Sequence, residues 1–188
     1  MKGLASYRQA PLHTRNIFIA TYRAEDDVIM IEGTLRDERL TEIYSVTTGE
    51  KLSPGIVHEI TLRLLVGKHL EVKDVEVEFK RMPREECQET AMSLKPLIGR
   101  RISLGFTLWA KKTFGGPKGC THLNGLLLAM APAAVQGFWS VAVSRPLTLR
   151  EASAVLDPTY LIDSCWVWRS DGPYAKEFRE TLGLNQPS

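Results

Sequence analysis

The segment between Val57 and Phe79 constrains the fold more than any other, because it predicts a β-hairpin with one buried face. Apolar and polar side chains alternate from Val57 to Val66. The predicted buried face of this strand carries His58, Ile60, Leu62, Leu64 and Val66. Gly67-Lys68-His69 predicts the turn, and the returning strand slips in phase at Lys73-Asp74, as a β-bulge would produce. The chain therefore contains an antiparallel strand pair with one solvated face.

Two further strands precede this hairpin. Asn16–Arg23 and Val28–Arg36 are rich in β-forming residues, and the acidic segment Ala24-Glu25-Asp26-Asp27 between them predicts a turn. A polar connector with Thr47-Thr48-Gly49-Glu50 leads into the second hairpin. Four or more antiparallel strands are therefore expected within residues 14–80.

From Pro83 onward the apolar spacing becomes helical. The first predicted helix has an apolar stripe formed by Cys87, Ala91, Leu94 and Ile98. Two more are predicted over Ile102–Phe114 and from Cys120 to about Ala142, the latter bent at Pro132. Strands followed by helices predict an α+β fold, with the helices packed on one face of the sheet.

The whole chain, residues 1–188, is expected to form a single domain. Its strand-rich part covers 14–80, its helical part 83–143, and an irregular, short-helical tail 150–188. The tail is predicted to contain a short helix near Arg150–Leu156 and a last helix near Tyr174–Leu182.

Charge and composition exclude several classes of protein. A net charge of +2 is too small to indicate a nucleic-acid or membrane-surface partner. The three cysteines are too few and too widely spaced for a disulfide framework, and no signal peptide is evident, so we expect a cytoplasmic location. The apolar stretch Leu123–Val143 is interrupted by Asn124, Pro132 and Gln136, which favours a buried helix over a membrane span.

The strongest chemical signal is the turn Gly119-Cys120-Thr121-His122-Leu123 at the start of the third predicted helix. The unpaired N–H groups and positive dipole end of a helix N-terminus favour a thiolate. Cys120 and His122 could therefore be a nucleophile and its base, two metal ligands, or a small buried cysteine with a capping histidine. The pair alone is weak as a metal motif, because structural zinc takes four ligands.

Other histidines and cysteines have ordinary structural explanations when taken singly. Cys87 lies on an apolar helical stripe, and His58 shares a strand face with apolar residues. His69 falls in a turn and is expected to be exposed, whereas His13 has no assigned role. Cys165 is expected to be buried under Trp166 and Trp168.

Four ordered motifs resemble a bacterial family known only as domain of unknown function twenty-eight eighty-nine. They are Leu12-His13-Thr14-Arg15, Val57-His58-Glu59-Ile60, Gly119-Cys120-Thr121-His122-Leu123 and Asp163-Ser164-Cys165. The resemblance covers about residues 10–175 and implies no established activity. Asp26-Asp27 departs from the Asp-Gly turn typical of that family.

Residues 57–137 also resemble, more distantly, the U-type iron–sulfur cluster scaffolds. His58, Cys87 and Cys120 fall at or near the positions of the scaffold's three cysteines, and His122 follows the third. The scaffold's aspartate would fall on Ile60, so that ligand is missing. The resemblance implies a scaffold-like fold and a mixed site of two histidines and two cysteines, suited to zinc or iron.

The leading hypothesis is therefore a metal-binding protein with zinc or iron held by His58, Cys87, Cys120 and His122. One alternative is an enzyme with Cys120 as nucleophile and a histidine base. The other is a module that binds a small molecule or a protein partner, with Trp166 and Trp168 lining the site. Whether the protein is an enzyme, and whether it forms a homodimer, stays open.

Overall fold

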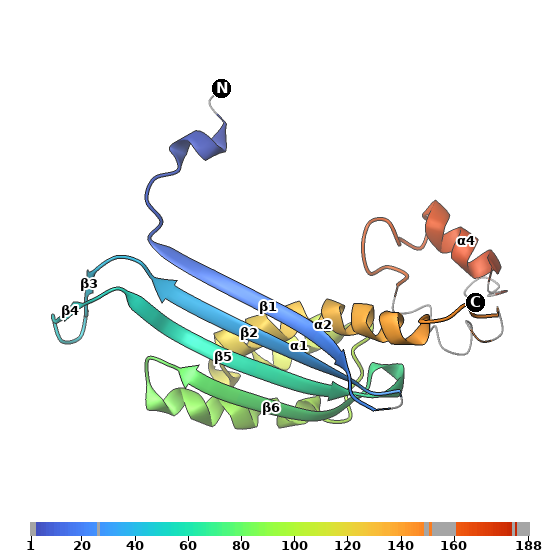
Figure 1. Ribbon diagram of the computed structural model, residues 1–188, viewed down its shortest axis with the longest axis horizontal. Helices are drawn as coiled ribbons and strands as arrows, with labels where there is room; N and C mark the ends of the chain where they lie inside the picture. Colours follow the sequence, from blue (N-terminus) through green and yellow to red (C-terminus); the bar gives the residue numbers. More distant parts are fainter. Residues whose placement is uncertain (1–2, 26, 149–150, 152–160, 182, 184–188) are drawn as a thin grey trace.

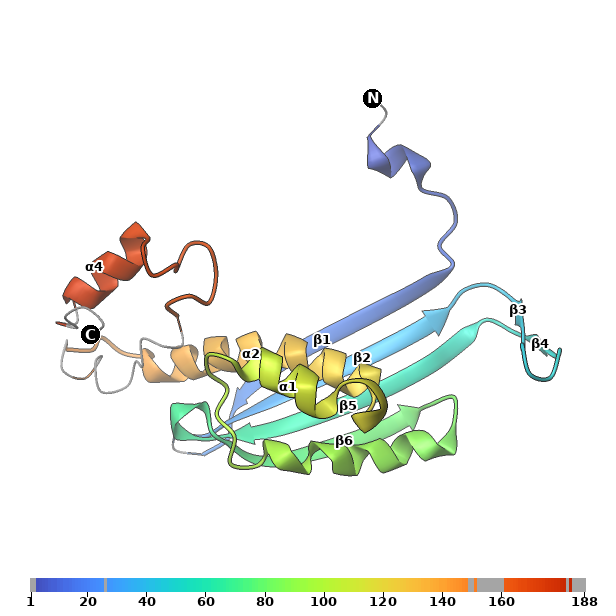
Figure 2. The same cartoon turned by 180° about the vertical axis from the view of Figure 1, so that it is seen from behind.

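A computed structural model describes residues 3–25, 27–148, 151, 161–181 and 183 of the chain. Its centre is a four-stranded antiparallel sheet with helices on one face, so the predicted α+β class is confirmed (Figures 1 and 2). The strand order is β1-β2-β5-β6, with bounds His13–Arg23, Ile29–Arg39, Gly55–Val66 and Val72–Arg81. Two short strands, β3 (Ile43–Tyr44) and β4 (Lys51–Leu52), pair separately within the polar connector.

The hairpin of β5 and β6 has the predicted bulge. Leu65 pairs with Asp74 and Val66 with Val72, so Lys73 has no opposite residue. The strand β2 extends three residues beyond the predicted end at Arg36, which brings Asp37 into the sheet. This extension matters because residue 37 lies where the candidate site forms.

The first predicted helix is a 3₁₀ helix, η3, from Glu85 to Leu97, and not an α-helix. A 3₁₀ helix has three residues per turn, so its buried residues are Leu94 and Leu97. The predicted stripe is wrong at Ile98, which caps the helix and is 50% exposed. Pro96 lacks an N–H group and cannot continue an α-helical hydrogen-bond pattern.

The next two helices lie close to their predicted positions. The helix α1 spans Phe106–Phe114 and begins four residues later than expected, because Gly105 adopts a left-handed conformation with φ of 83°. The helix α2 spans Thr121–Ala142 with Pro132 inside it. The described residues also include three short 3₁₀ helices elsewhere in the chain: η1 (Leu4–Tyr7), η2 (Lys68–Leu70) and η4 (Gly116–Lys118).

The helix α2 packs across β2, β1 and β5 (Figure 2). Its core-facing side chains include Leu123, Leu126, Leu127 and Met130. Gly33 in β2 permits a close approach, since an added Cβ there would lie 2.7 Å from the sulfur of Met130. This packing holds the N-terminal end of α2 over the sheet.

By length and composition, α2 is also the one helix among the described residues that could cross a membrane. The core helix of a soluble protein has the same properties. The helix α2 contacts three strands, but only 33% of its most apolar 18-residue window is buried, so burial of the whole helix stays a prediction.

The C-terminal part differs from prediction at Cys165. This residue is exposed, and Trp166 is 78% exposed, so the two tryptophans do not bury the thiol. Trp168 packs against Phe178 of α4 (Pro173–Thr181), with ring centroids 5.5 Å apart. The helix predicted near Arg150–Leu156 falls outside the described residues, apart from residue 151.

Candidate metal centre

Three neighbouring strands place Arg15, Asp37 and His58 side by side. Arg15 of β1 lies opposite Asp37 of β2, and Asp37 lies opposite His58 of β5. Directly opposed residues share one face of an antiparallel sheet. Ile60, two residues after His58, belongs to the core under the helices, so all three side chains share the helix-covered face.

The fourth side chain of the site is His122, which belongs to the helix α2. Cys120 is the N-cap of this helix, in an extended conformation, and His122 is its second residue. The ring of His122 lies against that of His58, with centroids 3.8 Å apart and planes tilted by 33°. The packing of α2 on the sheet thus brings together two histidines that are far apart in the sequence.

Asp37 is the centre of this cluster. Its Oδ2 lies 3.2 Å from Nδ1 of His58 and 3.4 Å from Nε2 of His122. Its Oδ1 lies 3.6 Å from Nε2 of His13, the first residue of β1. The side chain of Asp37 is only 4% exposed, so its negative charge requires nearby partners.

Arg15 supplies the compensating charge. Its Nε donates to Oδ1 of Asp37 at 2.6 Å, and its Nη2 donates to Oδ2 at 2.7 Å. These bonds lower the pKa of Asp37 below its usual value, against the opposing effect of burial. The carboxylate is therefore ionised at neutral pH and has a lone pair left on each oxygen.

The cluster of Asp37, His58 and His122 has the composition of a metal site. Each residue offers one ligand atom, and these atoms all lie within 4.8 Å of one another. Nδ1 of His58 is buried and has no hydrogen-bond partner among the described residues, although Oδ2 of Asp37 is close. A buried ring nitrogen without a hydrogen bond is uncommon and calls for an explanation.

His122 is held in its neutral form. Burial is the main cause of its lowered pKa, and the neighbouring His58 lowers it further, whereas Asp37 raises it. Neutral imidazole is the form that binds metals and that accepts a proton as a base. The other ring nitrogen, Nδ1, lies 3.7 Å from Sγ of Cys120.

This lowered pKa predicts a pH-dependent stability of the metal-free protein. As pH falls below about 6.5, the unfolded chain takes up a proton at residue 122 before the folded chain does, so stability falls. We expect urea unfolding with a chelator to show a larger loss between about pH 7.5 and about pH 5.5 in wild type than in His122→Asn. His69→Asn, in the exposed turn, should keep the wild-type loss. Equal losses in all three proteins would contradict the prediction.

The structure brings together only part of the predicted ligand set. His58 and His122 are in contact, and Cys120 adjoins His122. Cys87 lies in the first turn of η3 and is not a member of the three-residue group found among the described residues. The four-residue His/Cys set itself stays a prediction.

Asp37 and Arg15 were not predicted as site residues. A sequence signal for Asp37 did exist, because it continues the alternation of Ile29, Ile31, Gly33 and Leu35 on the buried face of β2. An acidic residue at such a position is unusual, since aspartate is rarely buried without a partner. Because the strand was predicted to end at Arg36, Asp37 was not recognised as part of its buried face.

Residues 13–136 match the sequence profile of a family described as a protein of unknown function (DUF2889). The chain belongs to this family. The match includes all the residues described above around the carboxylate, namely His13, Arg15, Asp37, His58, Cys120 and His122. It ends before the motif Asp163-Ser164-Cys165, so it is shorter than the resemblance predicted from the sequence. No curated protein and no solved structure gives a significant match, and the likeness to iron–sulfur scaffolds therefore stays a prediction.

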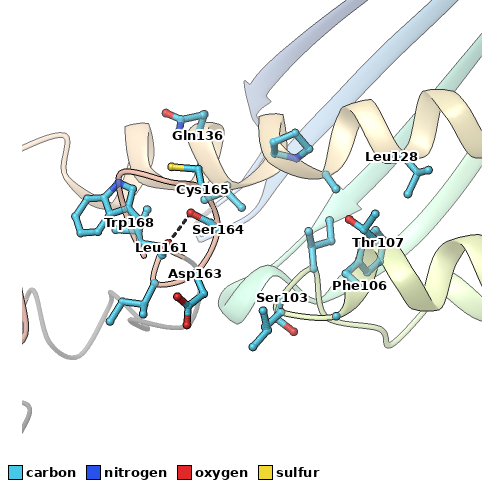
Figure 3. A pocket seen from close by; sticks show the side chains of 17 residues that line it. Ser103, Phe106, Thr107, Leu128, Gln136, Leu161, Asp163, Ser164, Cys165 and Trp168 are labelled. Atoms are coloured by element: carbon cyan, nitrogen blue, oxygen red, sulfur yellow. Dashed lines mark hydrogen bonds between the residues drawn. The ribbon is translucent and has the colours of Figure 1, made fainter. Parts of the chain in front are cut away.

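A separate cavity of about 630 Å³ lies between the start of α1, the middle of α2 and residues 161–168 (Figure 3). Trp168 lines it together with Phe106, Leu128 and other apolar side chains, whereas Trp166 does not. Cys165 also lines this cavity, and hydrogen bonds from the backbone N–H groups of Trp168 and Val167 lower the pKa of its thiol. Of the two tryptophans predicted to line a binding site, only Trp168 lines this cavity.

Proposed function

We propose that this protein binds one zinc or ferrous ion through Asp37, His58 and His122. Two imidazoles and a carboxylate are a ligand set used for zinc at catalytic sites and for non-haem iron. In both cases the protein leaves at least one coordination position open.

The observation that carries this proposal is the buried Nδ1 of His58. It faces Oδ2 of Asp37 without a hydrogen bond, and Nε2 of His122 faces the same oxygen. Ligand atoms about 2.0–2.1 Å from a tetrahedral metal lie about 3.3 Å apart. The nitrogen–oxygen distances of 3.2 and 3.4 Å fit that spacing.

The neighbours of these three residues have the roles that surround metal ligands in proteins. A ligating histidine usually donates its second N–H group to an acceptor, and Sγ of Cys120 is near Nδ1 of His122. A ligating carboxylate is usually hydrogen-bonded as well, and Arg15 donates twice to Asp37. Cys120 is thus an orienting partner of His122 in this proposal, in place of the ligand that the sequence indicated.

Metal content tests the proposal directly. Protein purified without chelator should hold about one zinc or iron ion per chain, and zinc at about 100 times its Kd should raise the unfolding free energy by about 2.7 kcal/mol. Cys87→Ser should leave the metal content unchanged, whereas Cys120→Ser should weaken binding by about 10–100-fold. Wild-type protein that binds neither metal would refute the proposal. Loss of the metal in Cys87→Ser would instead favour the His/Cys ligand set.

A second function is favoured by the position of His122 between Cys120 and Asp37. Its Nδ1 faces Sγ of Cys120 and its Nε2 faces Oδ2 of Asp37, the order of groups in a nucleophile–base–acid triad. Cys120 would add to a carbonyl carbon, whose π electrons would move to the carbonyl oxygen, and His122 would take the thiol proton. Peptide-resolved labelling with iodoacetamide tests this: Cys120 should react faster than Cys87, and His122→Asn should slow it. Equal labelling rates at both cysteines would exclude the nucleophile.

A further inference from the structure

We infer that the proposed metal centre takes an oxyanion, the carboxylate or phosphate group of a small molecule, which Arg39 and His13 hold at its open side. This inference rests on the proposed function and adds the class of ligand. Three protein ligands leave at least one position of the metal for another molecule.

The centre is open toward β1, the edge strand of the sheet. His13 and Arg15 of β1 have side chains that are 49% and 47% exposed, whereas Asp37, His58 and His122 are largely buried. A ligand from solvent therefore reaches the centre past the first residues of β1. Both residues at this entrance carry nitrogen donors.

Arg39 lies at the same entrance. It is directly opposite His13 in the β1–β2 ladder, and it follows Asp37 by two residues on β2. Residues two apart on a strand share a face and lie about 6.6 Å apart. Arg39, His13 and Asp37 therefore form one group on the helix-covered face of the sheet.

The guanidinium of Arg39 has a donor without an acceptor. Its Nη2 donates to the backbone oxygen of Ser53 at 2.6 Å, which fixes the side chain. Its Nε is buried and has no hydrogen-bond partner among the described residues. An unpaired, buried N–H of a charged group is costly. A ligand that supplies an acceptor for this N–H is therefore bound more tightly.

The charge balance selects an anion. Asp37 is the carboxylate of the proposed ligand set, and Arg15 already donates two hydrogen bonds to it. The divalent ion of the proposal and Arg39, two residues further along β2, add positive charge. Glu38 does not compensate this charge, because it pairs with Arg36 on the opposite face of β2. A carboxylate or phosphate matches both the metal and the fork of guanidinium donors.

Cobalt(II) in place of zinc makes the inference measurable, because its visible absorption changes when a new ligand enters its coordination sphere. Cobalt-loaded protein is titrated with inorganic phosphate and, separately, with acetate. Wild type should give a saturable absorption change with at least one of them. Arg39→Gln and His13→Gln should each bind cobalt normally and weaken anion binding by at least about tenfold, the equivalent of one charge-assisted hydrogen bond.

Arg36→Gln is the matched control, since it removes an arginine from the opposite face of the same strand. It should leave both metal and anion binding unchanged. Cobalt binding without any anion response, or with the same anion affinity in wild type, Arg39→Gln and His13→Gln, would overturn this inference alone. Failure of wild type to bind cobalt, zinc or ferrous iron would overturn the proposed function and this inference together. His13→Gln keeps the test decisive if Arg39→Gln does not fold, because His13 is half exposed.

Discussion

Replacing His58 by alanine is expected to weaken zinc binding by more than about 100-fold. Loss of a residue that merely orients a ligand costs about 10–100-fold, and His58 would be one of only three protein ligands. Two groups, Asp37 and His122, would remain, and they cannot fix the ion in a defined position. Zinc competition against a chromophoric chelator measures the change.

His69→Asn is the control for this substitution. His69 lies in an exposed turn with φ of 55°, a conformation that asparagine tolerates. Its zinc affinity should equal that of wild type. Urea unfolding of metal-free His58→Ala should show a folded protein, so that weaker binding reflects the lost ligand. Undiminished zinc affinity in His58→Ala would remove this residue from the site.

Replacing Arg15 by methionine is expected to lower the unfolding free energy of the metal-free protein by about 2–3 kcal/mol. Arg15 itself is half exposed, but its loss leaves the carboxylate of Asp37 buried without its main cation. Removal of one partner of a buried ion pair costs about 3–5 kcal/mol, and the access of water through the vacated position reduces this penalty. Urea unfolding with a chelator at neutral pH measures it.

The double variant Arg15→Met/Asp37→Leu should recover most of this loss, because no buried charge then remains unpaired. Arg23→Met, at the exposed end of the same strand, should change stability by less than about 0.5 kcal/mol. A similarly small effect of Arg15→Met would show that Asp37 does not depend on this ion pair.

The hairpin from Val57 to Phe79 shows why local pattern predicted much of the fold. Alternation of apolar and charged residues specifies which face of a strand is buried, and a slip in phase marks a bulge, here opposite Leu65 and Val66. The helix from Cys120 was equally clear, since it begins after glycines and stays apolar. By contrast, η3 has an apolar spacing that fits either helix type over a short length, and Ile98 was misplaced for that reason.

The candidate site was harder to predict than the fold. His58 and His122 could be named from their backbone positions, one on a strand face and one at a helix start. Asp37 could not be paired with them, because the end of a strand depends on pairing with its neighbours. The register that sets Asp37 opposite both Arg15 and His58 exists only when three strands are assembled.

The sequence by itself determined the antiparallel hairpins, the α+β order, and the special positions of His58, Cys120 and His122. These follow from the periodicity of side chains and from turn and helix-end residues, which act over a few neighbours. Only the tertiary structure decided that His58 and His122 are in contact, that they share the carboxylate of Asp37, and that Arg15 neutralises it. The physical reason is that the partners of the buried carboxylate belong to strands and a helix that are distant in sequence. Only the packing of these elements brings their side chains within hydrogen-bonding distance.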